Sequence, residues 1–197
     1  MPIIGIDEAG RGPLAGPVAV GVVTIREGFD KKFFKGIKDS KKFSAEEREL
    51  WFDLACEAKR LGDLNFKVTL VSEKIIDRKG IAYAIRLGIK RGLKALGASL
   101  ESQVFLDGGI RAPIEYFHQV TVIKGDEKIP IVSLASIVAK VTRDRRMVSM
   151  SKKFPGFDFH THKGYGTLLH RQAIQKYGLT ELHRRSFLKC LTGSSQV

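Results

Sequence analysis

The chain opens on Ile3-Ile4-Gly5-Ile6-Asp7-Glu8-Ala9-Gly10-Arg11-Gly12-Pro13-Leu14-Ala15-Gly16-Pro17, in which an apolar run ends in two adjacent acids and a glycine-rich turn. The apolar run predicts a β-strand with the two acids at its end. Because neighbouring carboxylates repel each other, Asp7 and Glu8 need a compensating cation, and a divalent metal ion suits that role. The glycines leave backbone amides open to a ligand above the acids. This stretch therefore predicts a functional site at the end of the first strand.

The net charge of the chain is strongly positive. The 34 Lys and Arg residues outnumber the 21 Asp and Glu residues, which gives a formal charge of +13 at pH 7. An excess of this size is typical of proteins that bind a phosphate backbone, although solubility alone is the simpler explanation. The composition thus favours a nucleic-acid partner.

The length and the remaining composition exclude several classes of protein. At 197 residues the chain fits a single domain, 1–197, with a basic, partly helical C-terminal part from about residue 151. It contains no apolar run of the roughly 18 residues that a membrane span needs. The N-terminus lacks the features of a signal peptide, so we expect a cytoplasmic protein. Cys56 and Cys190 lie far apart and outside any metal-binding pattern, which argues against a disulfide framework and a zinc site.

The first half of the chain predicts three strands and one helix. Residues 2–8 and 18–25 are β-rich, and the short turn between them favours antiparallel pairing. Ser44 and Glu47 form a capping-box pattern that predicts a helix over about residues 45–60. A third strand is expected over residues 64–71. Apolar residues then recur at helical spacing over residues 81–96, with basic residues on the opposite side.

The second half of the chain repeats the combination of a strand, an acid and a glycine. Residues 104–106 predict a short buried strand that runs into Asp107, and a strand over 117–123 precedes a turn that holds Asp126. Helices are expected over about residues 131–141 and near 167–177. Strands that first form a meander and later alternate with helices predict an α/β fold, with a mixed five-stranded sheet and helices on both faces.

Four acids therefore fall at predicted strand ends, namely Asp7, Glu8, Asp107 and Asp126. Strand ends are where α/β sheets hold their sites, and oxygen ligands without a Cys or His cluster fit Mg²⁺ or Mn²⁺ better than zinc. Each acid alone is ordinary turn chemistry. Together, in so basic a protein, they suggest two metal ions on a phosphodiester. Since successive strand residues face opposite ways, Glu8 can join Asp7 only at a distorted strand end, which Gly10 favours.

The opening motif resembles that of ribonuclease HII, the type 2 ribonuclease H family. The resemblance covers nearly the whole chain apart from about the last ten residues. It is carried further by Asp39-Ser40-Lys41-Lys42, Leu106-Asp107-Gly108, Lys124-Gly125-Asp126, Ala135-Ser136-Ile137-Val138-Ala139-Lys140-Val141 with Arg143-Asp144, His162-Lys163-Gly164-Tyr165-Gly166-Thr167, and His183-Arg184-Arg185-Ser186-Phe187.

The resemblance implies a ribonuclease H-like fold and an endoribonuclease that hydrolyses the RNA strand of RNA–DNA hybrids. It also implies cleavage 5′ of single ribonucleotides embedded in duplex DNA, with 3′-hydroxyl and 5′-phosphate ends. Its motifs assign metal binding and catalysis, with Mg²⁺ or Mn²⁺, to Asp7, Glu8, Asp107 and Asp126. Asp144 competes for the fourth place, but it lies four residues after Lys140, where an ion pair is the more ordinary explanation.

The same resemblance implies residues that bind the substrate. The turn Gly10-Arg11-Gly12 is where the family contacts the 2′-hydroxyl, and Tyr165 packs against the sugar on the DNA side of the junction. We assign Lys41, Lys163 and Arg184 to the phosphate backbone. His160 and His162 have a spacing that could ligate a metal, but without a third ligand nearby the signal is weak.

Rival functions remain at this stage. A dinucleotide-binding turn fails on the spacing of its glycines and on the two acids beside it. A basic module that binds nucleic acid without cleaving it would explain the charge equally well. A metal-free ribonuclease would use histidine and leave cyclic phosphates, and its cleavage would survive a chelator. We expect the chain to act as a monomer on RNA–DNA hybrids and on duplex DNA that contains ribonucleotides.

Overall fold

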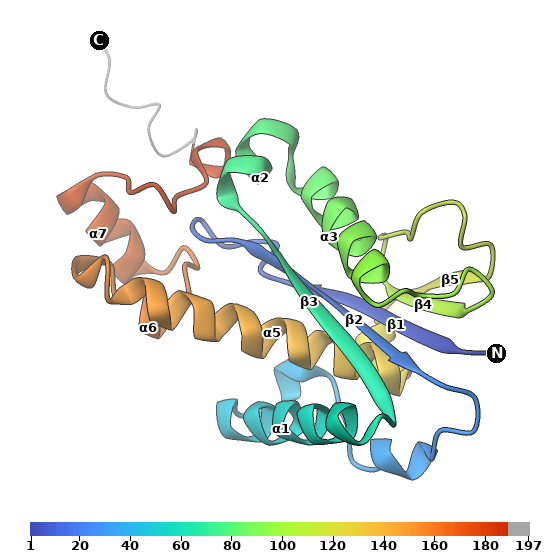
Figure 1. Ribbon diagram of the computed structural model, residues 1–197. Helices are drawn as coiled ribbons and strands as arrows, with labels where there is room; N and C mark the ends of the chain where they lie inside the picture. The colour runs from blue at the N-terminus through green and yellow to red at the C-terminus, as the bar shows by residue number, and fades with distance from the viewer. Residues whose placement is uncertain (189–197) are drawn as a thin grey trace.

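A mixed five-stranded sheet forms the centre of the computed structural model, which describes residues 1–188 (Figure 1). The strand order is β3-β2-β1-β4-β5. The strand β1 pairs antiparallel with β2 and parallel with β4; β2 and β3 are antiparallel, and β4 and β5 are parallel. The strands are β1 (Ile3–Ala9), β2 (Val18–Ile25), β3 (Leu64–Val71), β4 (Gln103–Asp107) and β5 (Gln119–Val122). The predicted mixed sheet is confirmed.

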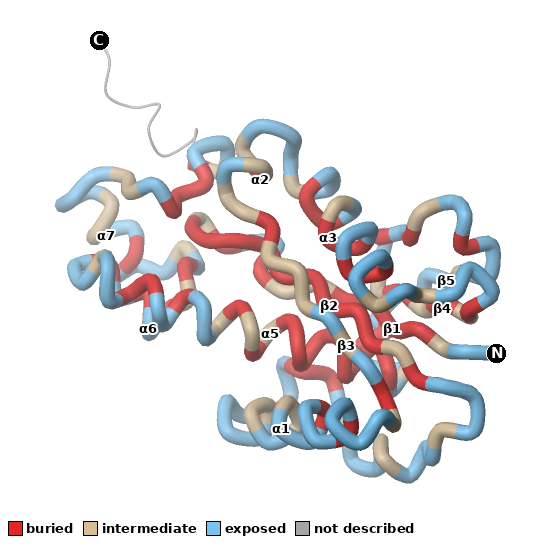
Figure 2. The backbone as a smooth tube through the Cα atoms, in the orientation of Figure 1, coloured by how far each residue is buried: buried red, intermediate tan, exposed pale blue. Residues whose placement is uncertain are grey.

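Helices cover both faces of this sheet (Figure 1). The helices α2 (Glu73–Lys79) and α3 (Ile81–Ala95) pack on one face, where Ile85 and Ile89 meet the apolar side chains of β1 and β2. The helices α1 (Ala45–Leu61) and α5 (Pro130–Ser151) cover the other face. Figure 2 shows that the strands of the centre are largely buried, whereas α1 exposes its outer side. Each face of the sheet therefore has its own apolar core.

Two glycines bring α5 directly onto the backbone of the sheet. A Cβ atom at Gly5 would lie 2.5 Å from the carbonyl oxygen of Ile131, and one at Gly21 would lie 2.3 Å from that of Ala135. Contacts this short exclude any side chain at these two positions. The close approach lays the first turns of α5 against β1, just before the acids at the end of that strand.

The C-terminal region from residue 151 to 188 packs on the second half of α5 and on the loop 10–17. It contains short helical turns and the longer helix α7 (Leu168–Tyr177), with α6 (Phe159–His162) before it. Its aromatic residues Phe157 and Phe159 share a small core with Ala15 and Met147. The loop 10–17 is thus held between the sheet and the C-terminal region.

Most elements match the prediction from the sequence. The helix α1 and its capping box, the strand β3 and the helix α7 lie where local patterns place them. The helix expected over 131–141 is wrong in length, since α5 continues to Ser151. The turn expected at 124–126 is a short helix, α4 (Gly125–Lys128), and α2 has no counterpart among the predicted elements. Cys190 lies outside the described residues.

No helix within residues 1–188 combines the length and the apolar character that a membrane crossing requires.

Candidate active site

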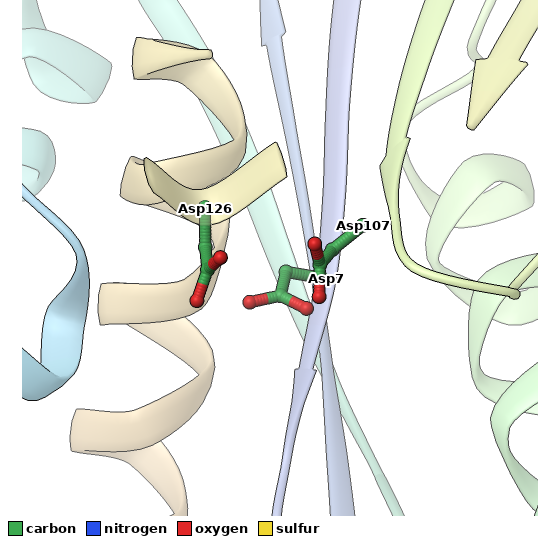
Figure 3. A group of neighbouring side chains, drawn as sticks. All are labelled: Asp7, Asp107 and Asp126. Atoms are coloured by element: carbon green, nitrogen blue, oxygen red, sulfur yellow. The ribbon is translucent and has the colours of Figure 1, made fainter. Parts of the chain in front are cut away.

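Three aspartates converge at one end of the sheet. Asp7 lies near the end of β1, Asp107 is the last residue of β4, and Asp126 lies in the short helix α4. One carboxylate oxygen from each lies within 4.8 Å of those of the other two, and Figure 3 shows the three carboxylates pointing toward one another. Because β1 and β4 are parallel neighbours, their carboxyl ends meet at the same edge. The topology of the sheet therefore brings together acids that are far apart in the sequence.

Hydrogen bonds fix the position of α4 over this edge. Asp107 accepts a bond from the backbone amide of Gly125, with 2.6 Å between Oδ1 and N. The hydroxyl of Ser133 in α5 donates to the carbonyl oxygen of Asp126 over 2.5 Å. These two bonds anchor α4 to β4 on one side and to α5 on the other, which explains why Asp126 faces the other two acids although it does not end a strand.

Burial makes the negative charge of these acids costly. Asp7 is 4% exposed, and its pKa is raised well above the ordinary value, first by burial and then by the negative charge of Glu8. Burial likewise raises the pKa of Asp126, although Lys41 opposes that shift. The Nζ atom of Lys41 lies 3.2 Å from Oδ2 of Asp126. Burial acts to lower the pKa of Lys41, but the bond and the charge of Asp126 outweigh it and the pKa is raised.

Glu8 lines the same pocket but does not belong to the group of three aspartates. The pairing of β1 with β2 continues through Glu8, opposite Val20, to Ala9, so the strand is not distorted where the sequence analysis expects it to be. In a regular strand Glu8 projects from the face opposite to that of Asp7. Burial raises the pKa of Glu8, and Arg11, whose Nη1 lies 3.4 Å from Oε1, opposes that shift. The other oxygen, Oε2, is buried and has no hydrogen-bond partner among the described residues.

These residues fit divalent metal ions. The ligand set consists of carboxylate oxygens alone, which Mg²⁺ and Mn²⁺ prefer over soft ligands. Asp7 and Asp126 are buried and Asp107 is half-buried, and their closely spaced carboxylates repel each other; the buried oxygen of Glu8 lacks a partner among the described residues. Within residues 1–188 the ammonium of Lys41 pairs with Asp126, and a single ammonium does not balance the charge of three aspartates. A bound cation would relieve both defects.

The acids open into a pocket of about 250 Å³. Its walls include the four predicted acids, the turn Gly10-Arg11-Gly12, Lys41 and Tyr165. Tyr165 is 41% exposed, so its ring is accessible from the pocket. Its ring lies 5.8 Å from Nζ of Lys140 and 5.8 Å from Cζ of Arg143. The structure thus brings most of the predicted site residues to one pocket.

Arg184 is an exception and requires a correction. Its side chain is 0% exposed, so it cannot reach a phosphate of the substrate, contrary to the prediction from the sequence. Its guanidinium donates to three carbonyl oxygens of the glycine loop, those of Gly10 at 2.7 Å, Arg11 at 3.0 Å and Gly16 at 2.9 Å. Burial, followed by the charge of Arg143, lowers the pKa of Arg184 to about 9. Arg184 therefore holds the loop from beneath.

A second buried guanidinium, that of Arg143 in α5, holds the same loop further along. It is also 0% exposed and donates to the carbonyl oxygens of Ala15 at 3.1 Å and Pro17 at 2.9 Å. Its third bond goes to the carbonyl oxygen of Lys163 at 3.0 Å. The two arginines thus donate hydrogen bonds to five carbonyl groups between residues 10 and 17. Carbonyl groups need donors, and a guanidinium offers several donors in fixed directions.

The backbone amides of the turn Gly10-Arg11-Gly12, unlike its carbonyl groups, are available to a ligand. While the carbonyl groups of Gly10 and Arg11 are engaged by Arg184, the amides of Arg11 and Gly12 donate to no group in the described part of the chain. A Cβ atom at Gly12 would meet nothing within 4 Å, so the space beside it is open. Unpaired amides at the rim of a pocket are ready donors for a ligand oxygen.

The remaining predicted residues lie near the pocket in different roles. Asp144 forms the expected ion pair with Lys140 over 2.8 Å and is not part of the aspartate group. The ammonium of Lys163 contacts the carbonyl oxygen of His160, and the residue lines a neighbouring pocket with Asp144. A phosphate contact by Lys163 stays a prediction.

The sequence analysis assigned no role to several residues that shape the site. Ser136 in α5 hydrogen-bonds to the carboxylate of Asp7, which lowers the pKa of that group against the larger effect of burial. Arg143 lies on the buried side of α5 with Ser136, Ala139, Met147 and Met150, but a charged residue among them gives no apolar pattern that would reveal its burial from the sequence. The buried cluster of His162, His170 and His183 gives no local signal, since its members meet only in the folded chain.

Comparisons with known proteins agree with this architecture. The family model described as Ribonuclease HII matches residues 4–190. The chain is 41% identical to the Ribonuclease HII of Caldicellulosiruptor bescii over 187 residues, which cover 95% of this chain and 86% of the relative. It is 38% identical to the Ribonuclease HII of Sulfurovum sp. over 94% of this chain and 91% of that relative.

Solved structures show the same fold. The ribonuclease HII in the PCNA:RNase HII complex from Archaeoglobus fulgidus superimposes with a TM-score of 0.76 at 27% identity, over 98% of this chain and 97% of that one. The ribonuclease H2 from Pyrococcus horikoshii gives a TM-score of 0.70 at 29% identity, over 94% and 93% of the two chains. The chain therefore belongs to the ribonuclease HII family and is a metal-dependent endoribonuclease that acts on RNA–DNA hybrids.

Proposed function

We propose that this enzyme cuts on the 5′ side of single ribonucleotides embedded in duplex DNA, as well as within the RNA strand of longer hybrids, and leaves 3′-hydroxyl and 5′-phosphate ends. One observation carries the proposal. Three aspartates, two of them buried, have ligand oxygens within 4.8 Å of one another and share a pocket with a turn whose amides have no partner among the described residues. The acids would hold the metal ions for hydrolysis, and the turn would recognise the ribose.

Asp7, Asp107 and Asp126 would hold two divalent ions, Mg²⁺ or Mn²⁺, and Glu8 would complete the set from the other face of β1. When bound, such ions stabilise the negative charge on the attacking and leaving oxygens of a phosphodiester. Ser136 and the amide of Gly125 orient the carboxylates of Asp7 and Asp107. Burial keeps the site in a low-dielectric environment, in which charge stabilisation is strong.

The turn Gly10-Arg11-Gly12 would recognise the ribonucleotide. A 2′-hydroxyl both donates and accepts hydrogen bonds, and the amides of Arg11 and Gly12 are free to donate to it. Tyr165, exposed on the same pocket, would pack against the following deoxyribose, whose smaller sugar edge fits a planar ring. The turn would require a 2′-hydroxyl on the ribose, and Tyr165 would require its absence on the next sugar. Together they would select a junction from RNA to DNA.

Lys41 and Lys163 would contact the phosphate backbone, and the net charge of +13 would strengthen binding to any nucleic acid. The loop 10–17 is held between the sheet and the C-terminal region, which supports one catalytic domain that includes residues 151–188. We expect this domain to act as a monomer.

Cleavage of an end-labelled DNA duplex with one ribonucleotide tests the proposal. With Mg²⁺ or Mn²⁺ we expect a single cut 5′ of the ribonucleotide and a product with a 5′-phosphate, whereas EDTA should abolish cleavage. An all-DNA duplex controls for general nuclease activity, and Asp144→Asn controls for loss of an acid outside the aspartate group. Binding without cleavage would indicate a non-catalytic binder, and cyclic phosphates formed in EDTA would indicate a metal-free ribonuclease; either result contradicts the proposal.

A further inference from the structure

Three buried histidines form a continuous cluster in the C-terminal region, with one each from α6, α7 and the segment after α7. His170 is fully buried, and His162 and His183 are nearly so. The rings of His162 and His170 stack with centroids 4.4 Å apart, and Nε2 of His170 lies 3.1 Å from Nε2 of His183. Burial lowers the pKa of all three, so they are neutral at pH 7.

The hydrogen bonds of the cluster fix the proton on each ring. His183 accepts a bond from the backbone amide of Thr180 at Nδ1, so its proton lies on Nε2 and points to His170. Nε2 of His170 accepts this hydrogen bond from His183, so the proton of His170 lies on Nδ1. That Nδ1–H group donates over 2.8 Å to the carbonyl oxygen of Tyr165. The bonds therefore run in one direction, from Thr180 through two histidines to Tyr165.

His162 supports the same segment from the other side. It accepts a bond at Nδ1 from the amide of Gly164 over 3.1 Å and donates from Nε2 to the carbonyl oxygen of Phe157 over 2.6 Å. The carbonyl oxygen of Gly164 in turn accepts the amides of Leu14 and Ala15 in the glycine loop. Every ring nitrogen of the cluster thus has a hydrogen-bond partner, which leaves no lone pair for a metal ion.

We propose that this chain of neutral histidines positions Tyr165 for discrimination between ribose and deoxyribose, with His170 as the positioning residue. The backbone of Tyr165 is fixed by the bond from His170, and its ring is left free to face the pocket. A shift of the carbonyl group would move the ring away from the sugar without disturbing the aspartates. The proposal rests on the function proposed above for Tyr165, and it adds the residues that hold it.

Two pairs of substitutions separate positioning from general packing. The amide nitrogen of Asn reaches the place of Nδ1 in histidine, and that of Gln reaches the place of Nε2. His170→Asn keeps the donor to Tyr165, whereas His170→Gln loses it. For His183 the order is reversed, since His183→Gln keeps the donor to His170 and His183→Asn loses it. All four variants remove a buried ring, so their unfolding temperatures should fall by comparable amounts.

The first readout is the ratio of kcat/KM on a duplex with one ribonucleotide to kcat/KM on a long hybrid. We expect His170→Gln to lower this ratio roughly tenfold, the effect of one lost hydrogen bond, and His170→Asn to leave it within about twofold of the wild type. His183→Asn should lower it less than His170→Gln, and His183→Gln should lower it least. Combined with Tyr165→Ala, His170→Gln should cause no additional loss, because both act on the same contact.

The second readout does not require activity. The ¹³C-labelled ring of Tyr165, assigned by comparison with Tyr165→Phe, should keep its chemical shift in His170→Asn and change it in His170→Gln. If Asn and Gln affect the ratio and the ring signal equally at both positions, the histidines only fill space and the proposal is overturned. If instead the wild type does not prefer the single-ribonucleotide duplex, the proposed function of Tyr165 fails, while the ring signal still decides whether His170 positions it.

Discussion

The guanidinium of Arg184 lies 2.7 Å from the carbonyl oxygen of Gly10, across 174 residues of sequence. This bond joins the segment after α7 to the turn beside the three aspartates. Because the carbonyl groups of the turn accept hydrogen bonds from this buried cation, the turn is held in place while the amides of Arg11 and Gly12 have no partner among the described residues. The C-terminal region therefore helps to shape the proposed active site, although residues 151–188 contribute no acid to the aspartate group.

Replacing Arg184 with Lys should destabilise the protein. An ammonium lacks the planar set of donors that bonds three carbonyl groups at once, so at least one carbonyl would stay buried without a partner. Each such group costs about 1–3 kcal/mol, and urea unfolding should show a loss in this range. The control is Arg185→Lys, an exposed neighbour whose side chain forms no hydrogen bond or ion pair with residues 1–188, and it should leave the free energy of unfolding unchanged.

A second substitution, Arg184→Met, removes the charge and tests the corrected role of Arg184. A residue that bound a phosphate would, when its charge is removed, lower the salt dependence of KM by about one unit of slope. We expect Arg184→Met to leave that slope unchanged and to lower kcat, because the turn moves. A reduced slope with normal stability would restore the original assignment to the phosphate backbone.

Asp7→Asn should abolish activity and stabilise the metal-free protein. Loss of a carboxylate that would hold both ions should lower kcat by roughly 10³-fold or more. In EDTA at pH 7 the melting temperature should rise by about 2–4 °C, the shift that corresponds to about 1 kcal/mol in a chain of this size. The reason is that the wild type buries a carboxylate among other acids, which Asn does not.

The effect of pH on Asp7 has a defined sign. Because the pKa of Asp7 is raised in the folded protein, the folded state binds a proton more readily, and the stability of the metal-free wild type is lost as pH rises. The advantage of Asp7→Asn should therefore shrink as pH falls from 7 toward 5. If the difference in melting temperature between Asp7→Asn and the wild type stays constant or grows on acidification, the pKa of Asp7 is not raised in the folded protein.

Lys41→Met should change metal and substrate binding in opposite directions. The ammonium of Lys41 lies 3.2 Å from Asp126, where it competes with a cation for the same oxygen. Removing one exposed charge at this distance should tighten Mg²⁺ binding roughly two- to fivefold by calorimetry and weaken binding to every duplex. Lys42→Met is the matched control, since Lys42 pairs with Glu127 outside the aspartate group. Equal effects of the two variants on Mg²⁺ binding would refute this role of Lys41.

His183 should stay neutral far below the ordinary range of histidine. Burial, followed by the repulsion that a protonated His183 would meet from protonation of His170 and, to a lesser degree, His162, lowers its pKa to about 4 from 6.5. The unfolded chain then binds more protons between these two values, so stability falls as pH falls through this window. The contribution of His183 is about 3 kcal/mol less at pH 4 than at pH 7. Titration of the ring by NMR measures this directly, and a midpoint near 6.5 would contradict the neutral cluster.

The sequence predicts those parts of the fold that depend on local patterns. The helix α1 was placed by its capping box and β3 by its β-rich residues, and both agree with the structure within one or two residues. The sequence also predicted that Asp7, Asp107 and Asp126 lie together, and they do: Asp7 and Asp107 meet because parallel neighbours bring their ends to the same edge, whereas Asp126 reaches them from the short helix α4. The expected ion pair of Lys140 and Asp144 depends only on the spacing of one helix turn.

The errors concern residues whose surroundings come from distant segments. Arg184 was assigned to the phosphate backbone of the substrate, but it is buried, and its burial depends on carbonyl groups more than 160 residues away. The predicted helix 131–141 was too short because Arg143, a charged residue, lies on its buried side, where carbonyl groups of the glycine loop satisfy it. The distortion expected at Glu8 is absent because pairing with β2 keeps β1 regular.

The central claim is that Asp7, Asp107 and Asp126 hold the ions that catalysis requires. Anomalous X-ray diffraction from crystals soaked with Mn²⁺ tests it most directly. We predict at least one strong anomalous peak between the three carboxylates, about 2.1 Å from their oxygens, and none there in crystals of Asp7→Asn. Manganese bound elsewhere, with no peak among the three aspartates of an enzyme that cleaves its duplex in Mn²⁺, would contradict the account.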